Sequence, residues 1–159
     1  MEREWVVEES VVVGVAPEAA YGVVAQVRRT GEWSPECRAV WARRGALVAG
    51  ERFVGWNRKG LLLWFTTCRV TVAEPGREFA FRVGALGLPI ALWGYRFEPA
   101  ADGGTVLTEY WQDLRTGRSR RPAELLGLVF SGTRAEDRAG VNRAGMRTTL
   151  ERMKAALER

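Results

Sequence analysis

The sequence predicts an α+β fold in which a curved antiparallel sheet of about seven strands wraps around a long C-terminal helix, with one or two short helices after the first strand. Three observations support this prediction. Residues 133–159 have the apolar spacing of a long amphipathic helix. Residues 37–114 consist of short segments rich in aromatic and β-branched residues, separated by turn sequences. These turns are too short for the crossover that parallel strands need, so the strands form an antiparallel meander.

The N-terminal region predicts one strand followed by helical segments. Residues 5–13 are rich in valine and alternate loosely between polar and apolar side chains, as in a strand. Pro17 suits the first position of a helix, and Glu18 is favourable at the positive end of the helix dipole. Gly31 ends this helix, and residues 32–36 form a turn or a single helical coil. The buried side of the helix would consist of Ala20, Tyr21, Val24 and Val27.

The meander then continues through six strands joined by turns rich in glycine, proline, asparagine and aspartate. We expect these strands near residues 37–43, 51–58, 62–73, 77–84, 90–98 and 105–114.

The C-terminal helix is predicted over residues 133–159. Thr133 and Glu136 have the spacing of a capping box, which places the start of the helix there, after a break at residues 131–132. A short apolar segment, residues 123–130, precedes the break. The apolar and adaptable side of the long helix consists of Asn142, Met146, Thr149, Leu150, Met153 and Leu157.

Composition excludes several classes of function. The chain of 159 residues fits one domain, which we expect to span residues 1–159. It contains no histidine and only two cysteines, Cys37 and Cys68, so we expect no metal site, and every histidine-based catalytic triad is excluded. The charged N-terminus and the lack of an apolar run of about 20 residues predict a cytoplasmic protein without a membrane span.

Arginine supplies most of the net charge of +5. Four arginines, Arg115, Arg118, Arg120 and Arg121, lie close together in the sequence. They could bind nucleic acid or an anionic membrane, or form a solvated loop between the last strand and the helical region. The lack of an aromatic residue among them argues against nucleic acid as the partner. The sequence leaves open whether the protein is a monomer or a homodimer.

Period-two alternation assigns the side chains of each strand to two faces of the sheet. The inner face takes Trp64, Thr66, Cys68, Val70, Val72, Phe79, Phe81, Val83, Ala91, Trp93, Tyr95 and Phe97. In the last strand the inner set is either Leu107, Glu109, Trp111 and Asp113 or Val106, Thr108, Tyr110 and Gln112. We prefer the first set, which places Glu109 in the interior.

This inner face and the C-terminal helix would enclose either a packed core or a ligand cavity. Polar tips among the aromatic side chains favour a cavity, and so do Gly55 and Gly94, which leave space without a side chain. Residues 86–89 and 125–130 are apolar and could form its rim. The candidate ligand-binding residues are Phe53, Asn57, Trp64, Thr66, Phe81, Trp93, Tyr95, Trp111, Asn142 and Met146.

Glu109 is the one candidate for catalysis. If it lies in an apolar pocket, desolvation raises its pKa and keeps it protonated near neutral pH, as a general acid requires. The alternative is that Glu109 faces solvent or pairs with a structural arginine.

Several segments of the chain carry a family resemblance: residues 16–21 (APEAAY), 31–37 (GEWSPEC), 50–58 (GERFVGWNR), 103–105 (GGT) leading into Thr108 and Glu109, and 142–146 (NRAGM). With these segments in this order along the sequence, the chain resembles the helix-grip fold of the START-like (SRPBCC) superfamily, and more specifically its polyketide cyclase/dehydrase branch. The resemblance implies a deep hydrophobic cavity between sheet and helix, of the kind used for lipids, sterols, hormones and polyketides. It implies no cofactor, and no catalytic set can be aligned residue by residue.

Three functions therefore follow as hypotheses. The first is a domain that binds a small hydrophobic molecule, lipid-like or polyketide-like. The second is a cofactor-independent polyketide cyclase or dehydratase that folds its substrate and assists with acid or base chemistry. The third is a protein-interaction or regulatory module, for which the loop of residues 115–121 would be the contact.

Overall fold

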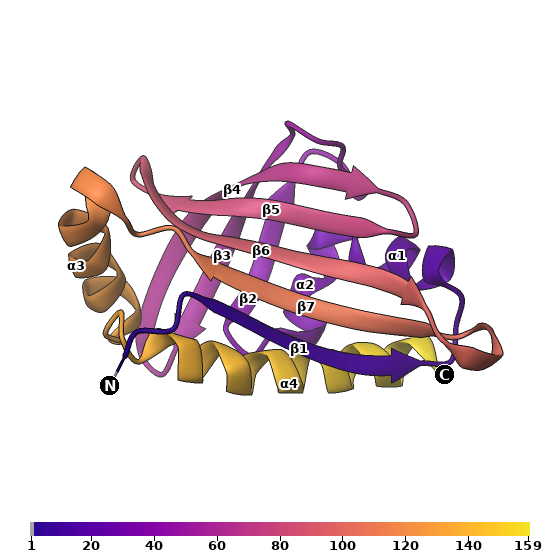
Figure 1. Cartoon of the computed structure of the whole chain (residues 1–159). Coiled ribbons are helices and arrows are strands. Elements are labelled where there is room, and N and C mark those ends of the chain that lie inside the picture. Colours follow the sequence, from indigo (N-terminus) through magenta and orange to yellow (C-terminus); the bar gives the residue numbers. More distant parts are fainter. Residues whose placement is uncertain (1) are drawn as a thin grey trace.

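A computed structural model describes residues 2–159 of the chain (Figure 1). One antiparallel sheet has the strand order β1-β7-β6-β5-β4-β3-β2, so every strand from β2 to β7 lies beside the next in sequence and β1 closes the far edge. This confirms the predicted meander. The strands are β1 (Val6–Val13), β2 (Cys37–Ala42), β3 (Arg52–Lys59), β4 (Leu62–Glu74), β5 (Glu78–Ala85), β6 (Leu88–Pro99) and β7 (Thr105–Asp113).

Helices lie against the concave side and at one end of this sheet. The long helix α4 (Arg138–Leu157) runs beside β1 along the length of the sheet, and α3 (Arg120–Ser131) stands at the end where β7 leaves it (Figure 1). The predicted α+β, helix-grip arrangement is thus confirmed. Among residues 2–159, no helix combines the length and the apolar character needed to cross a bilayer. The shorter helices are α1 (Pro17–Val24), η1 (Val27–Arg29), α2 (Thr30–Trp33), η2 (Ala101–Gly103) and η3 (Gly117–Ser119).

The region after β1 differs from the prediction in one respect. Gly31 does not end the first helix, because α1 ends earlier, at Val24, and Gly31 lies inside α2. The glycine is needed there for a close approach, since a Cβ atom would lie 2.6 Å from the carbonyl oxygen of Arg38. Gly31 therefore allows α2 to press directly on the backbone of β2.

The predicted start of the C-terminal helix is wrong. Residues 133–137 are not helical, and α4 begins at Arg138 without a side-chain cap. The Thr133 hydroxyl that a capping box would use instead accepts a 2.6 Å hydrogen bond from Nζ of Lys59. The predicted break before it is confirmed: Gly132, with φ of +67°, ends α3 in the left-handed conformation that glycine tolerates.

A β-bulge corrects the predicted inner face of β4. Val70 pairs with Phe81, but the register shifts at this point and Val72 pairs with Ala80. The extra residue moves Val72 to the opposite face, and Ala73, which pairs with Phe79, packs against the core in its place. In β7 the preferred set is the inner one, because Leu107 and Trp111 belong to the core clusters.

The interior is solid beneath one half of α4 and hollow beneath the other. Leu150 and Met153, in the C-terminal half, pack into a core with Phe79, Phe97 and Leu107. The N-terminal half, around Asn142 and Met146, lines a cavity instead. The fold therefore places this cavity at the end of the molecule near α3.

Candidate functional site

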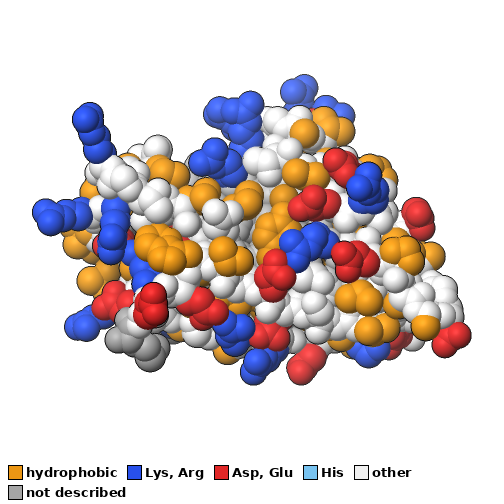
Figure 2. Space-filling view, in the orientation of Figure 1, with side chains coloured by type: hydrophobic (Ala, Val, Ile, Leu, Met, Phe, Trp, Pro, Cys, Tyr) orange, Lys and Arg blue, Asp and Glu red, His pale blue; other side chains and the backbone are white. Residues whose placement is uncertain are grey.

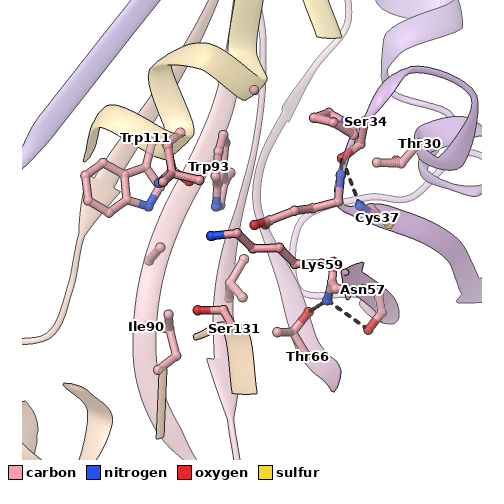
Figure 3. Close-up of a pocket in the computed structure, with 18 of the residues that line it drawn as sticks. Thr30, Ser34, Cys37, Asn57, Lys59, Thr66, Ile90, Trp93, Trp111 and Ser131 are labelled. Atoms are coloured by element: carbon pink, nitrogen blue, oxygen red, sulfur yellow. Dashed lines mark hydrogen bonds between the residues drawn. The ribbon is translucent and has the colours of Figure 1, made fainter. Parts of the chain in front are cut away.

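A cavity of about 570 Å³ lies between the inner face of the sheet and the N-terminal half of α4 (Figure 3). Strands β3 to β7 supply one wall, and α3 and residues 34–38 supply the sides. The ten residues that the sequence suggested for ligand binding all line this cavity, and Glu109 does so as well.

Seven aromatic residues contribute to the apolar wall. Trp93 and Trp111 are paired across β6 and β7, and Figure 3 shows both on the same side of the cavity. Phe53 and Phe81 meet edge to face, with their ring centroids 5.1 Å apart. Rings in this geometry attract one another and hold a fixed shape. Phe53 and Phe81 thus support one another on the cavity wall.

A polar corner lies opposite the tryptophans. The Asn57 side chain donates hydrogen bonds to the hydroxyl of Thr66 at 3.4 Å and to the carbonyl oxygen of Gly55 at 3.5 Å (Figure 3). Gly55 faces the cavity, as the sequence analysis expected. Both bonds are long, so Asn57 remains able to exchange them for a bond to a ligand.

Gly94 was wrongly assigned to the cavity. It lies between the inward residues Trp93 and Tyr95 and therefore faces the convex side of the sheet. There the ring of Tyr110 occupies its space, because a Cβ atom on Gly94 would lie 2.2 Å from Cζ of Tyr110. The Tyr110 hydroxyl continues past the glycine and donates a 2.7 Å hydrogen bond to Glu78.

Glu109 is 3 % exposed and lines the cavity. Its Oε1 accepts a 3.0 Å hydrogen bond from the Tyr95 hydroxyl, and its Oε2 has no partner among residues 2–159. Burial raises the pKa of this carboxyl group to about 8, although the bond from Tyr95 acts in the other direction. Glu109 is therefore mostly protonated at neutral pH, which is the state the sequence analysis required of a general acid.

Asn142 is a second buried polar side chain on this cavity. It comes from α4, on the opposite wall from Glu109, and is 4 % exposed. Its Nδ2 has no hydrogen-bond partner within the described part of the chain. A buried amide donor without a partner costs free energy, and a ligand oxygen that reached it would recover that cost.

Arg115 does not belong to an exposed basic loop. It is 3 % exposed and lines the cavity, with Nε 2.9 Å and Nη2 2.8 Å from the carboxylate oxygens of Asp113. Burial acts to raise the pKa of Asp113, but hydrogen bonds from Arg115 and Arg3 keep it below its usual value. Sequence reasoning missed this pair because it grouped Arg115 with its neighbours Arg118, Arg120 and Arg121, which are exposed.

The two cysteines also line the cavity and are unbridged. Burial raises the pKa of Cys37 to about 11 and that of Cys68 to about 12, so both thiols stay protonated and are poor nucleophiles at neutral pH. Across residues 2–159, no three cysteine or carboxylate side chains gather in a way that would hold a metal ion.

Lys59 lines the cavity without having been predicted to. Figure 3 shows its side chain extending across the cavity from β3, and its amine donates to Thr133 beyond α3. Because Lys59 lies at the last position of a strand, next to a turn, alternation alone gave no signal for it.

Solved structures share this architecture. The Polyketide_cyc-like protein Cgl2372 from Corynebacterium glutamicum is 28% identical to the chain and aligns over 100% of this chain and 92% of its own, with a TM-score of 0.59. The di-domain ARO/CYC StfQ from the steffimycin biosynthetic pathway is 16% identical, with a TM-score of 0.67 over 94% of this chain and 49% of its own. Ara h 8.0201 is 11% identical, with a TM-score of 0.64 over 96% of both chains.

At the level of sequence, none of the curated proteins matches the chain. A family model does match it, over residues 4–158, which is nearly its whole length. This match agrees with the sheet, the helices and the order of the elements. The chain therefore belongs to the polyketide cyclase/dehydrase and lipid transport family.

Proposed function

We propose that this protein binds a small hydrophobic molecule, lipid-like or polyketide-like, in the cavity between the sheet and α4. The cavity carries the proposal, because its volume of about 570 Å³ is typical of pockets for small ligands. Its wall combines aromatic rings with a few fixed polar groups, which is the mixture that binds an apolar body and orients it. Membership of a family described by polyketide cyclisation and lipid transport agrees with this class of ligand.

A cavity-filling variant tests the proposal. Val83 lines the cavity, so Val83→Trp should occupy part of it, whereas Val12 is exposed on β1 and Val12→Trp should not. We expect native mass spectrometry of freshly purified protein to show a retained apolar compound. We also expect the neutral dye Nile red to bind wild type and Val12→Trp with similar affinity, and Val83→Trp at least ten-fold more weakly. Equal dye binding by all three folded proteins would contradict the proposal.

A second candidate is catalysis of cyclisation or dehydration, and the state of Glu109 favours it. A protonated carboxyl on the cavity wall can donate its proton to a ligand carbonyl or to a hydroxyl that leaves as water. The cavity would contribute by holding a flexible poly-ketone in one folded shape. Incubation with a synthetic poly-ketone, followed by product analysis, separates the two candidates. New rings formed by wild type but not by Glu109→Gln indicate an enzyme, and unchanged ligand indicates a binding protein.

A further inference from the structure

Exposed apolar side chains gather on three segments at one end of the molecule. Leu61 and Leu63, at the β3–β4 turn, are 95% and 73% exposed, and Leu86, at the β5–β6 turn, is 67% exposed. On α3, Leu125, Leu128 and Val129 are also exposed. We call these six residues the apolar end.

The three segments are held at the same end of the fold. Figure 1 shows the β5–β6 turn beside α3, at the end opposite η2. The β3–β4 turn is joined to the segment after α3 by the hydrogen bond from Lys59 to Thr133. Leu62 also reaches this segment, since its Cδ1 lies 3.0 Å from the position that a Cβ on Gly132 would take. The apolar end is therefore one surface and not three separate loops.

Basic side chains surround this surface. Arg58 precedes the β3–β4 turn, Arg118 lies in η3, and Arg120 and Arg121 begin α3. Figure 2 shows basic side chains with hydrophobic ones between them at the end where α3 lies. Glu124, the one acidic residue of α3, is already paired with Arg3 and Arg120. The surface thus combines apolar side chains with positive charge, and a partner must supply apolar contact and negative charge.

The side chains of the β3–β4 hairpin change in character with distance from its tip. Leu61 and Leu63 are at the tip, and Arg58 pairs with Leu63. Two residue pairs further back, Trp56 pairs with Phe65 on the convex face, with ring centroids 5.6 Å apart and both rings exposed. Leucines beside a basic residue near the tip, with an aromatic pair behind them, suit a bilayer surface, where apolar side chains insert, basic side chains meet anionic headgroups and aromatic rings lie at headgroup level.

We propose that the apolar end docks on a membrane surface that contains anionic lipids, with the leucines of the two turns and the apolar side chains of α3 inserted into its interfacial layer. Residues 58–60 and 126–127 from these same segments line the cavity, so docking would bring the cavity wall to the bilayer. The docking itself does not depend on the proposed function, because it needs no ligand in the cavity. Each basic residue at an anionic surface strengthens binding by about five-fold, and apolar insertion adds to this.

Sedimentation with vesicles tests the docking. Wild type should bind vesicles of phosphatidylcholine mixed with phosphatidylglycerol, and should bind pure phosphatidylcholine vesicles far more weakly. The double variant Leu61→Ser, Leu63→Ser should lose roughly ten-fold or more in partitioning, because two exposed leucines leave the interfacial layer. The double variant Arg118→Gln, Arg121→Gln should lose most of the preference for phosphatidylglycerol.

The matched control is Val12→Ser, Val48→Ser, which removes two exposed apolar side chains far from the apolar end, on β1 and in the β2–β3 connection, and should bind as wild type does. Circular dichroism and melting temperature confirm that each variant is folded. If wild type fails to sediment with anionic vesicles, or if Leu61→Ser, Leu63→Ser binds them as well as wild type, the proposal is wrong. The apolar end would then be left as a contact for another protein. Nile red binding by the same protein variants is measured in a separate experiment. A variant or wild type that binds the dye but not the vesicles then shows that the docking proposal, and not the cavity proposal, is wrong.

Discussion

Tyr95 and Glu109 are directly opposite one another on β6 and β7, and the Tyr95 hydroxyl donates a 3.0 Å hydrogen bond to Oε1 of Glu109. Both side chains are buried on the inner face of the sheet. Because this bond satisfies only one carboxyl oxygen, Oε2 is left without a partner among residues 2–159. The pair therefore fixes the orientation of a buried carboxyl group on the cavity wall.

The raised pKa of Glu109 predicts a pH dependence of stability. The group binds its proton up to about pH 8 in the folded protein but only up to about pH 4.5 when unfolded. The associated stabilisation is thus fully present below pH 4.5 and is lost as pH rises towards 8. Glu109→Gln, which needs no proton, should be more stable than wild type by on the order of 3 kcal/mol at pH 7.

Urea denaturation of both proteins at several pH values between 5 and 8 checks this, because the difference between them cancels the other titrating groups. The advantage of the glutamine variant should grow with pH across this range. A difference that stays constant would show that Glu109 is ionised in the folded protein.

The packing of Tyr110 over Gly94 predicts a large effect from one methyl group. Gly94→Ala would place Cβ 2.2 Å from the Tyr110 ring, so the ring must move and lose its bond to Glu78. We expect a loss of about 2–4 kcal/mol in the free energy of unfolding. In the background Tyr110→Ser, the same change should cost much less, since the ring is gone.

Gly140→Ala is the matched control. Gly140 lies in α4 with open space at its Cβ position, and alanine should stabilise the helix by about 0.5–1 kcal/mol. Equal effects of the two alanines would mean that Tyr110 does not occupy the space above Gly94.

Alternation and turn chemistry were sufficient to predict the sheet, because the meander is built from local strands and short turns. What they could not predict depends on contacts between distant segments. Thr133 has the sequence of a helix cap, yet Lys59, 74 positions earlier, takes its hydroxyl. Val72 left the inner face because a bulge shifted the register, and a bulge has no reliable signal in one sequence.

The candidate site likewise contains some residues that the local sequence pattern predicted and others that it did not. Eight of the ten suggested residues lie on strands and line the cavity because each strand face follows from period two, and Asn142 and Met146 line it because they share one side of α4. Cys68 was placed on the inner face, but Lys59, Arg115 and Cys37 were not, since their positions depend on side-chain partners and on where a strand begins or ends. The apolar segment 123–130 was recognised, but its helical form as α3 was not, because it is short and apolar on most sides.

The buried pair of Asp113 and Arg115 predicts a stability effect that its exposed neighbours lack. Arg115→Met leaves the Asp113 carboxylate buried with only Arg3 to balance it, and should cost about 3–5 kcal/mol in the free energy of unfolding. Arg118→Met, at an exposed position, should change it by less than about 0.5 kcal/mol. Chemical denaturation measures both, and the double variant Asp113→Asn, Arg115→Met should recover part of the loss. Equal stabilities of the two arginine variants would show that the ion pair contributes little.

The burial of the two cysteines predicts that their thiols are modified slowly. A ligand in the cavity should make this modification slower still. With pKa values of about 11 and 12, Cys37 and Cys68 are almost entirely protonated at pH 8, and both are buried. Iodoacetamide should therefore modify the native protein at least a hundred-fold more slowly than the protein unfolded in urea, since the thiolate is the reactive form. Because both side chains line the cavity, Nile red should reduce the native rate again. Mass spectrometry of timed samples gives both rates. Rapid modification of the native protein would mean that the cavity is open to solvent at the thiols, and an unchanged rate with saturating dye would place the dye elsewhere.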